Sequence, residues 1–154
     1  MRIDYSCGAE TLAFVSAEID EHFSQDCARG VGIRSDAGQL VAGWVWHNYS
    51  PDAGTIEFSG AATTAKWMTR AILQELFDYA FSFSQMVVTR NAADNKRLHR
   101  QLKAFGFTRI DIPRLFGRDA DGVVWTLTDD TWRASRFNMK READGQEIQT
   151  SCAA

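Results

Sequence analysis

The sequence predicts an α/β (α+β) domain in which a mixed, mostly antiparallel sheet is flanked by helices on both faces. Stretches whose apolar residues recur every three or four positions alternate along the chain with short stretches of strand type. Turn residues join three successive strand candidates into a meander, as in antiparallel sheets. A short apolar strand also stands between the two long helices, as expected of a strand that is buried on both faces and pairs in parallel.

The composition is that of one folded domain. A chain of 154 residues with 45% apolar residues can bury a core without disulfides. The net charge of −3 gives no overall field that would attract nucleic acid or an anionic membrane. Three cysteines without metal-ligand spacing suit a reducing compartment, and no secretory signal or membrane-spanning run is found. We therefore expect a cytoplasmic protein without a metal that binds neither nucleic acid nor membranes.

The first half of the chain is expected to form one helix and four strands. Leu12, Val15 and Ile19 recur at helical spacing. Further along, the turn sequences 35–38 and 48–54 separate stretches of strand type, because their Asp, Asn, Pro and Gly residues end regular structure. The expected elements are a short strand at 2–6, a helix at 9–23 and strands at 31–34, 40–47 and 55–59.

The longest helix and the strand after it come next. Thr63 or Thr64 is suited to cap the start of this helix, which should end near Phe83. The strand at 86–89 is wholly of strand type and mostly apolar. We expect it to be the central strand of the sheet and to run parallel to the strand at 55–59.

A second long helix follows that strand. Leu98, Leu102 and Phe105 form one apolar stripe at helical spacing. Gly106 stands where a left-handed C-cap is wanted, so the helix should end there. The candidates for its N-cap are Asn91, Asp94 and Asn95.

The chain is expected to end with a hairpin and a polar segment. Strands at 107–116 and 123–127 flank a Gly- and Asp-containing turn and should pair antiparallel. After Arg136 the sequence is polar and without periodicity. We therefore predict one domain over residues 1–136 and a flexible polar tail over 137–154.

This order of elements resembles that of the GCN5-related N-acetyltransferase (GNAT) superfamily. The resemblance covers roughly residues 31–132 and is carried by an ordered set of short motifs. Asn95 precedes a helix that ends at Gly106-Phe107, an Asp121-Gly122 turn follows, and Trp132 stands soon after the last strand. Within the superfamily, the sequence looks most like the branch that acetylates the N-termini of ribosomal proteins.

The resemblance implies an acyl-CoA-dependent N-acyltransferase with a GNAT-like sheet. Such an enzyme would transfer an acetyl group from acetyl-CoA to a primary amine by direct attack, with no metal. The acceptor implied is the amine of a small molecule or of a protein or peptide, and a homodimer stays open. The positions that the resemblance assigns to acetyl-CoA binding are Thr64, Ala65, Lys66, Trp67, Met68 and Thr69, together with Asn95.

Two positions depart from the superfamily's pattern. The segment Thr64–Thr69 lacks the glycines that let phosphates approach a helix N-terminus closely, and Trp67 stands in their place. Lys66 would compensate for this electrostatically. Leu102 occupies the position where many members carry a tyrosine that protonates the departing thiolate. These departures support an alternative, a catalytically degenerate GNAT-like domain that serves as a binding or structural module.

Two residues are candidates for removing a proton from the amine. Glu57 lies in the strand where several members place their general base, and burial would raise the pKa of its carboxyl. His47 lies at the end of the neighbouring predicted strand and titrates near neutrality. The alternatives are a salt-bridged Glu57 and a surface His47, and we expect His99 to be exposed. Ser59, like Ser16 and the cysteines, shows no paired base, so nucleophilic catalysis has no support in the sequence.

Overall fold

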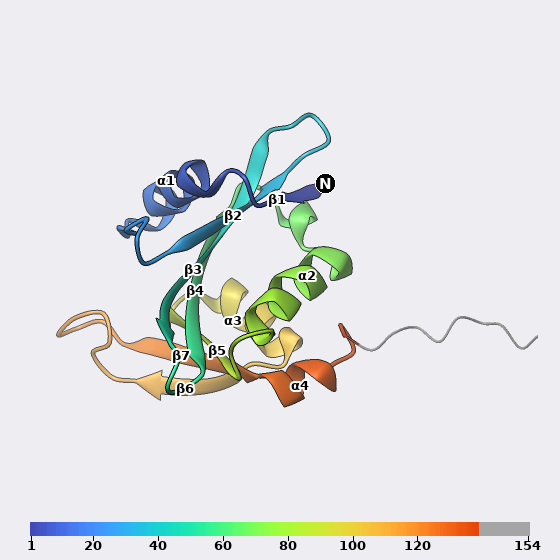
Figure 1. Ribbon diagram of the computed structural model, residues 1–154. Helices are drawn as coiled ribbons and strands as arrows, with labels where there is room; N and C mark the ends of the chain where they lie inside the picture. Colours follow the sequence, from blue (N-terminus) through green and yellow to red (C-terminus); the bar gives the residue numbers. More distant parts are fainter. Residues whose placement is uncertain (139–154) are drawn as a thin grey trace, which may run out of the picture.

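A computed structural model describes residues 1–138 and consists of a seven-stranded sheet with helices on both faces (Figure 1). Within these residues no helix is long and apolar enough to cross a membrane. In chain order the elements are β1 (Arg2–Asp4), α1 (Gly8–Ile19), β2 (Arg29–Arg34), β3 (Leu40–Ser50), β4 (Thr55–Ala62), the 3-10 turn η1 (Ala65–Trp67), α2 (Arg70–Phe81), β5 (Met86–Ala92), α3 (Lys96–Phe105), β6 (Thr108–Ile112), β7 (Gly122–Thr128) and α4 (Asp129–Arg133).

The sheet is mixed and mostly antiparallel, which confirms the predicted fold class. Its strand order is β1-β2-β3-β4-β5-β7-β6, and only β4 and β5 pair in parallel. The predicted parallel pairing of these two strands is therefore confirmed. The predicted central position of β5 is wrong, because the final hairpin adds only two strands beyond it while four strands precede it. The middle strand is β4.

The two faces of the sheet carry separate apolar clusters. Along β3 the side chains alternate between the faces. Val45 joins α1 in the smaller cluster, whereas Trp44 and Trp46 join α2 in the larger one. In that larger cluster the ring of Trp44 stacks on Phe58 with 4.2 Å between ring centres, and Phe77 meets Trp44 edge-on at 5.7 Å. The predicted cover of helices on both faces is thus confirmed (Figure 1).

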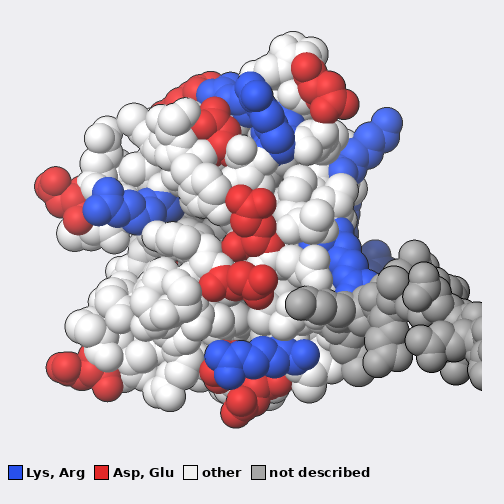
Figure 2. Space-filling model, turned by 45° about the vertical axis from the view of Figure 1, so that its right-hand side comes forward, with Lys and Arg blue, Asp and Glu red and all other residues white. Residues whose placement is uncertain are grey.

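The face that α2 covers is acidic at its middle. Figure 2 shows Asp and Glu side chains over this helix, with Lys and Arg side chains toward the rim of the same face. The acidic residues of α2 are Glu75 and Asp78. Asp78 accepts a hydrogen bond from the indole nitrogen of Trp132 at 3.2 Å, which ties α4 to α2.

Two helices are shorter than the sequence predicts. α1 ends at Ile19, because Asp20 adopts a left-handed conformation with φ of 53°. α2 begins only at Arg70, because the preceding residues form η1 and bury the side chain of Trp67. Thr69, rather than Thr63 or Thr64, caps α2. Its hydroxyl accepts a hydrogen bond from the backbone N–H of Ile72 at 3.3 Å.

The ends of α3 are set by its own sequence. The N-cap is Asn95, not Asn91 or Asp94, and its side-chain oxygen accepts from the backbone N–H of Leu98 at 3.3 Å. Gly106 ends the helix in a left-handed conformation with φ of 98°, as predicted.

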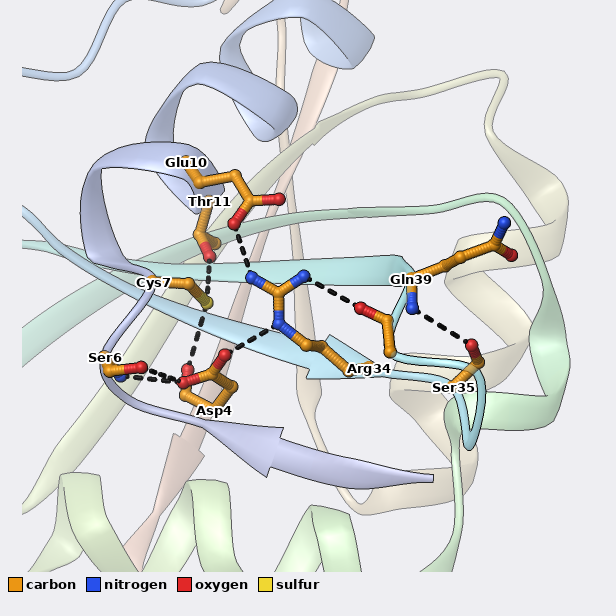
Figure 3. A network of polar contacts seen from close by, with 9 residues as sticks. Asp4, Ser6, Cys7, Glu10, Thr11, Arg34, Ser35 and Gln39 are labelled. Atoms are coloured by element: carbon orange, nitrogen blue, oxygen red, sulfur yellow. Dashed lines mark hydrogen bonds and ion pairs between the residues drawn. The ribbon is translucent and has the colours of Figure 1, made fainter.

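A polar network fastens β1 and α1 to β2, as Figure 3 shows. The Arg34 guanidinium donates to Asp4 at 2.7 Å, to Glu10, and to the carbonyl oxygen of Gly38 at 3.1 Å. Hydrogen bonds from Ser6 and from the Arg34 guanidinium hold the pKa of the Asp4 carboxyl well below its usual range. The first strand of the sheet is therefore held by side chains as well as by its backbone pairing.

The last described residues pack against the helices. The ring of Phe137 meets Phe105 of α3 edge-on at 5.3 Å, and its carbonyl oxygen accepts from the Arg70 guanidinium at 2.9 Å. Phe137 falls within the segment for which the sequence predicts a tail, yet it joins the edge of the larger apolar cluster. The rest of that segment, 139–154, lies outside the described residues.

Candidate functional site

The candidate site is a cavity where β4 and β5 diverge. The two strands pair over only three positions, the last of them Glu57 opposite Val88. β4 nevertheless continues to Ala62 and β5 to Ala92. The edges that face each other beyond Glu57 and Val88 are therefore not paired. A cavity of about 640 Å³ occupies this region, bordered by both strands and by the segments that begin α2 and α3.

The cavity has an apolar side and a more polar side. Phe58 belongs to the larger apolar cluster, on the face of the sheet that α2 covers. Ser59, the next residue along β4, points to the opposite face, which α1 covers. Trp44, Trp67 and Leu98 extend the apolar lining. Further residues that line the cavity are Ile19, Glu21, Arg90, Asn91, Arg97 and Phe116.

Five of the seven positions predicted to bind acetyl-CoA border the cavity. They are Thr64, Ala65, Trp67, Met68 and Asn95. The other two do not line it. Lys66 is exposed, and the hydroxyl of Thr69 is used to cap α2. Trp67 is buried edge-on against Trp44, with 5.9 Å between ring centres, so that it forms part of the wall.

Two buried polar atoms of the lining residues have no hydrogen-bond partner among the described residues. They are the indole nitrogen of Trp44, a donor, and the side-chain oxygen of Asn91, an acceptor. Such atoms are normally satisfied, so a ligand carbonyl would suit the Trp44 donor and a ligand N–H would suit the Asn91 acceptor. From the sequence, Trp44 is expected to be a core residue or a wall of the substrate groove, and Asn91 is expected only as a helix cap. Asn91 follows the predicted end of its strand, and only the longer β5 turns it toward the interior.

His47 is buried, with 8% of its surface exposed, rather than lying at the surface. β3 continues to Ser50, so His47 is inside the strand instead of at its end. Its Nε2 lies 3.0 Å from the hydroxyl oxygen of Ser59, and its Nδ1 lies 4.0 Å from the carboxylate of Glu57. The ring of Phe23 packs against the imidazole at 5.1 Å. The expectation that Ser59 has no paired base is therefore wrong.

Burial lowers the pKa of His47. The carboxylates of Glu57 and Glu21 act in the opposite direction, and the Arg90 guanidinium lowers the pKa further. Since the ordinary value is about 6.5, the imidazole is neutral at pH 7 and able to accept a proton.

Glu57 is held by two donors. Arg90 donates to its carboxylate at 2.9 Å and Asn48 at 3.2 Å. The salt-bridged alternative for this residue thus matches its contacts. Neither Glu57 nor His47 lines the cavity, whereas Ser59 and Arg90 do.

Two residues of α3 face inward. Leu102, at the position where the superfamily often has tyrosine, is 2% exposed and forms part of the apolar lining. His99 is buried rather than exposed, because this side of α3 packs on β6 and β7. Its ring lies 5.5 Å from that of Trp125, and its Nδ1 is 3.4 Å from the Arg109 guanidinium.

Comparison with known proteins finds solved structures with a similar fold but low sequence identity. No family model matches the chain, and no curated protein matches it. A spermidine N-acetyltransferase SpeG chimera from Vibrio cholerae and hSSAT has a TM-score of 0.69 at 13% identity, covering 86% of this chain and 98% of its own. A structure from Acinetobacter baylyi described as an acetyltransferase has a TM-score of 0.65 at 20% identity, covering 84% and 92%. The dodecameric spermidine N-acetyltransferase of Vibrio cholerae has a TM-score of 0.60 at 14% identity, covering 70% and 68%. At these identities the comparison establishes the fold alone, a GNAT-like mixed sheet with helices on both faces.

Proposed function

We propose that this chain, which has the fold of GNAT acetyltransferases, is an acyl-CoA-dependent N-acyltransferase that transfers an acetyl group from acetyl-CoA to a primary amine. The observation that carries the proposal is the cavity between the diverging ends of β4 and β5. Its lining includes residues before α2 and at the start of α3, and also Ser59, on the face of the sheet that α1 covers. One ligand could therefore extend from the helix starts to Ser59. A two-substrate transfer needs such a passage, because donor and acceptor must meet at one carbon atom.

The segment before α2 and the start of α3 are the parts that would hold acetyl-CoA. The backbone N–H groups that the Thr69 cap leaves free, together with the positive end of the helix dipole, suit a pyrophosphate at the start of α2. Asn95 would contact the amide-bearing arm of the cofactor, and the unpartnered atoms of Trp44 and Asn91 are suited to the same arm. When bound, acetyl-CoA supplies an acyl carbon that is activated by its thioester.

Leu102 leaves no acid at the usual position for protonating the departing sulfur. A free thiol has a pKa of about 8.5, so a thiolate is a good leaving group near neutral pH. The reaction therefore proceeds in this proposal without a dedicated acid at that position. The low polarity around Leu102 instead keeps water from the thioester.

The acceptor is proposed to be a primary amine of a small molecule or of a peptide. Glu21 is the only acidic side chain among the described residues that line the cavity. A polycation would be poorly neutralised by one carboxylate, so an amine with a single positive charge fits better. The resemblance to the ribosomal-protein branch favours a peptide N-terminus, and the fold neighbours named for spermidine acetylation favour a small amine.

A titration with acetyl-CoA tests the proposal. Calorimetry should show one site, and acetyl-CoA at 100 times its Kd should stabilise the fold by about 2.7 kcal/mol. Release of free thiol on addition of an amine then measures transfer. No binding at millimolar acetyl-CoA contradicts the proposal.

The second candidate function is a degenerate binding or structural module. The segment Thr64–Thr69 without glycine and the apolar Leu102 favour it. Binding of acetyl-CoA without thiol release from any amine of a broad panel would support this alternative over the enzyme.

A further inference from the structure

We propose that Ser59 and His47 together remove the proton from the acceptor amine, Ser59 at the cavity wall and His47 behind it. The inference rests on the proposed function and adds to it the route of the proton. Ser59 takes the proton of the bound ammonium group while it gives its own hydroxyl proton to His47.

The positions of the two side chains support this route. His47 does not line the cavity, so an amine bound there has no direct contact with the imidazole. Ser59 lines the cavity, and its hydroxyl oxygen is 3.0 Å from His47 Nε2, a normal hydrogen-bond distance. A hydroxyl both donates and accepts, so Ser59 can connect the two. His47 is on β3 and Ser59 is on β4, and the antiparallel pairing of these two strands holds both side chains in place.

The charges around His47 suit a group that gains a proton for a short time. Glu57 on β4 lies 4.0 Å from Nδ1, and Glu21, after α1, also favours the protonated ring. Arg90 on β5 opposes them. Burial keeps the free ring neutral, while Glu57 limits the cost of the imidazolium.

Glu57 and Arg90 act in this proposal as positioning residues. For Nε2 to accept from Ser59, the ring proton must lie on Nδ1, the side of Glu57. Arg90 and Asn48 fix the carboxylate that faces this proton. Glu57 is thus not the base itself, because it has no contact with the cavity.

The transfer conserves protons and bonds. The ammonium loses one proton through Ser59 to His47, and its nitrogen lone pair forms a bond to the acyl carbon as the carbon–sulfur bond breaks. The nitrogen loses its second proton, which ends on the sulfur of the free thiol. His47 then releases its proton to water, so that ammonium and thioester give amide, thiol and one proton.

The test compares S59A, S59T and H47Q with the wild-type chain. Acetyl-CoA binding is measured by calorimetry, and thiol release is measured from pH 5 to pH 9 with spermidine, phenethylamine and a tripeptide with a free N-terminus. We expect S59A and H47Q each to lower kcat/KM by about 100-fold or more at pH 7, as for loss of a general base. The double variant should be no slower than H47Q, because both residues serve one step. S59T keeps a hydroxyl and should keep the rise of kcat/KM with pH.

A serine outside the cavity provides the matched control. Ser50 is a half-buried residue of β3, and S50A should transfer acetyl groups like the wild-type chain. Thermal unfolding of every variant separates loss of the fold from loss of the step. S59A that binds acetyl-CoA and keeps the wild-type rate and pH profile would overturn the relay while leaving the proposed function intact. Failure of the wild-type chain to bind acetyl-CoA would overturn both.

Mass spectrometry distinguishes the relay from a covalent route. If Ser59 were instead a nucleophile, acetyl-CoA alone would leave one acetyl group on its hydroxyl. We expect no such adduct at any time after mixing. An acetylated Ser59 that transfers its group to the amine would overturn the relay.

Discussion

At the scale of residues, the surroundings of His47 determine the pH at which the site works. Charged side chains act on it in opposite directions: Glu57 and Glu21 favour the imidazolium, and Arg90 opposes it. Glu57 lies one strand away from His47 and Arg90 lies two strands away, and these two side chains are hydrogen-bonded to each other. Their separate removal therefore gives two shifts of opposite sign.

In E57Q the pH profile should move to lower pH. Loss of the carboxylate lowers the pKa of His47 further, so the ring is neutral, and able to accept a proton, down to a lower pH. In R90Q the guanidinium is lost, the pKa of His47 rises, and the acid limb of kcat/KM should move to higher pH. The measurement is kcat/KM between pH 5 and pH 8 for both variants. Shifts in the same direction would contradict this account of the charges.

Only part of the site is predictable from the sequence. His47 and Glu57 are predictable as titratable residues on adjacent strands. The pairing of His47 with Ser59 depends on the register of β3 and β4, which no residue pattern specifies. This register also has an irregularity between His47 and Ser50. The burial of His47 follows from the extra length of β3, because the strand continues through residues that the sequence assigns to a turn.

At the scale of elements, the interrupted start of α2 shapes the cavity. The helical pattern of the sequence suggests a continuous helix from Thr63 or Thr64, but burying Trp67 requires a turn before the helix begins. The parallel pairing of β4 and β5 was predictable, because a helix joins two strands of one sheet. The position of β5 in the strand order was not predictable, since the sequence does not show which edge strand the final hairpin pairs with.

The cap of α2 offers a test of this element. Replacing Thr69 with alanine removes the hydroxyl that accepts from the Ile72 N–H, and should lower the free energy of unfolding by about 1 kcal/mol. T69S keeps the cap and should restore most of the loss. Denaturant unfolding measures both variants. An equal loss in T69S and T69A would show that the methyl group, not the hydroxyl, stabilises the helix start.

At the scale of the whole molecule, both ends of the described chain are fixed to the sheet and helices. Near the N-terminus, the Arg34 network joins β1, α1 and β2 (Figure 3). At the other end, Phe137 joins α2 and α3 through Arg70 and Phe105. The sequence predicts a boundary after Arg136, because polar residues dominate from there on. It does not show that Phe137 itself packs.

Replacing Phe137 with alanine tests this long-range contact. The loss of one half-buried ring and its aromatic partner should lower the free energy of unfolding by about 1–2 kcal/mol. I110A, at an exposed apolar residue of β6, serves as control and should have a much smaller effect. Thermal unfolding measures both. Equal melting temperatures for F137A and the wild-type chain would place Phe137 outside the cooperative fold.

The divergence of β4 and β5 has a consequence for how such a site changes over generations. Beyond Glu57 and Val88 the two strands present main-chain groups to the cavity instead of to each other. Every residue type except proline carries the same main-chain donor and acceptor. A recognition surface made of these groups survives the replacement of nearly all its side chains. Sequences that share as little as 13% of their residues can thus keep one backbone arrangement.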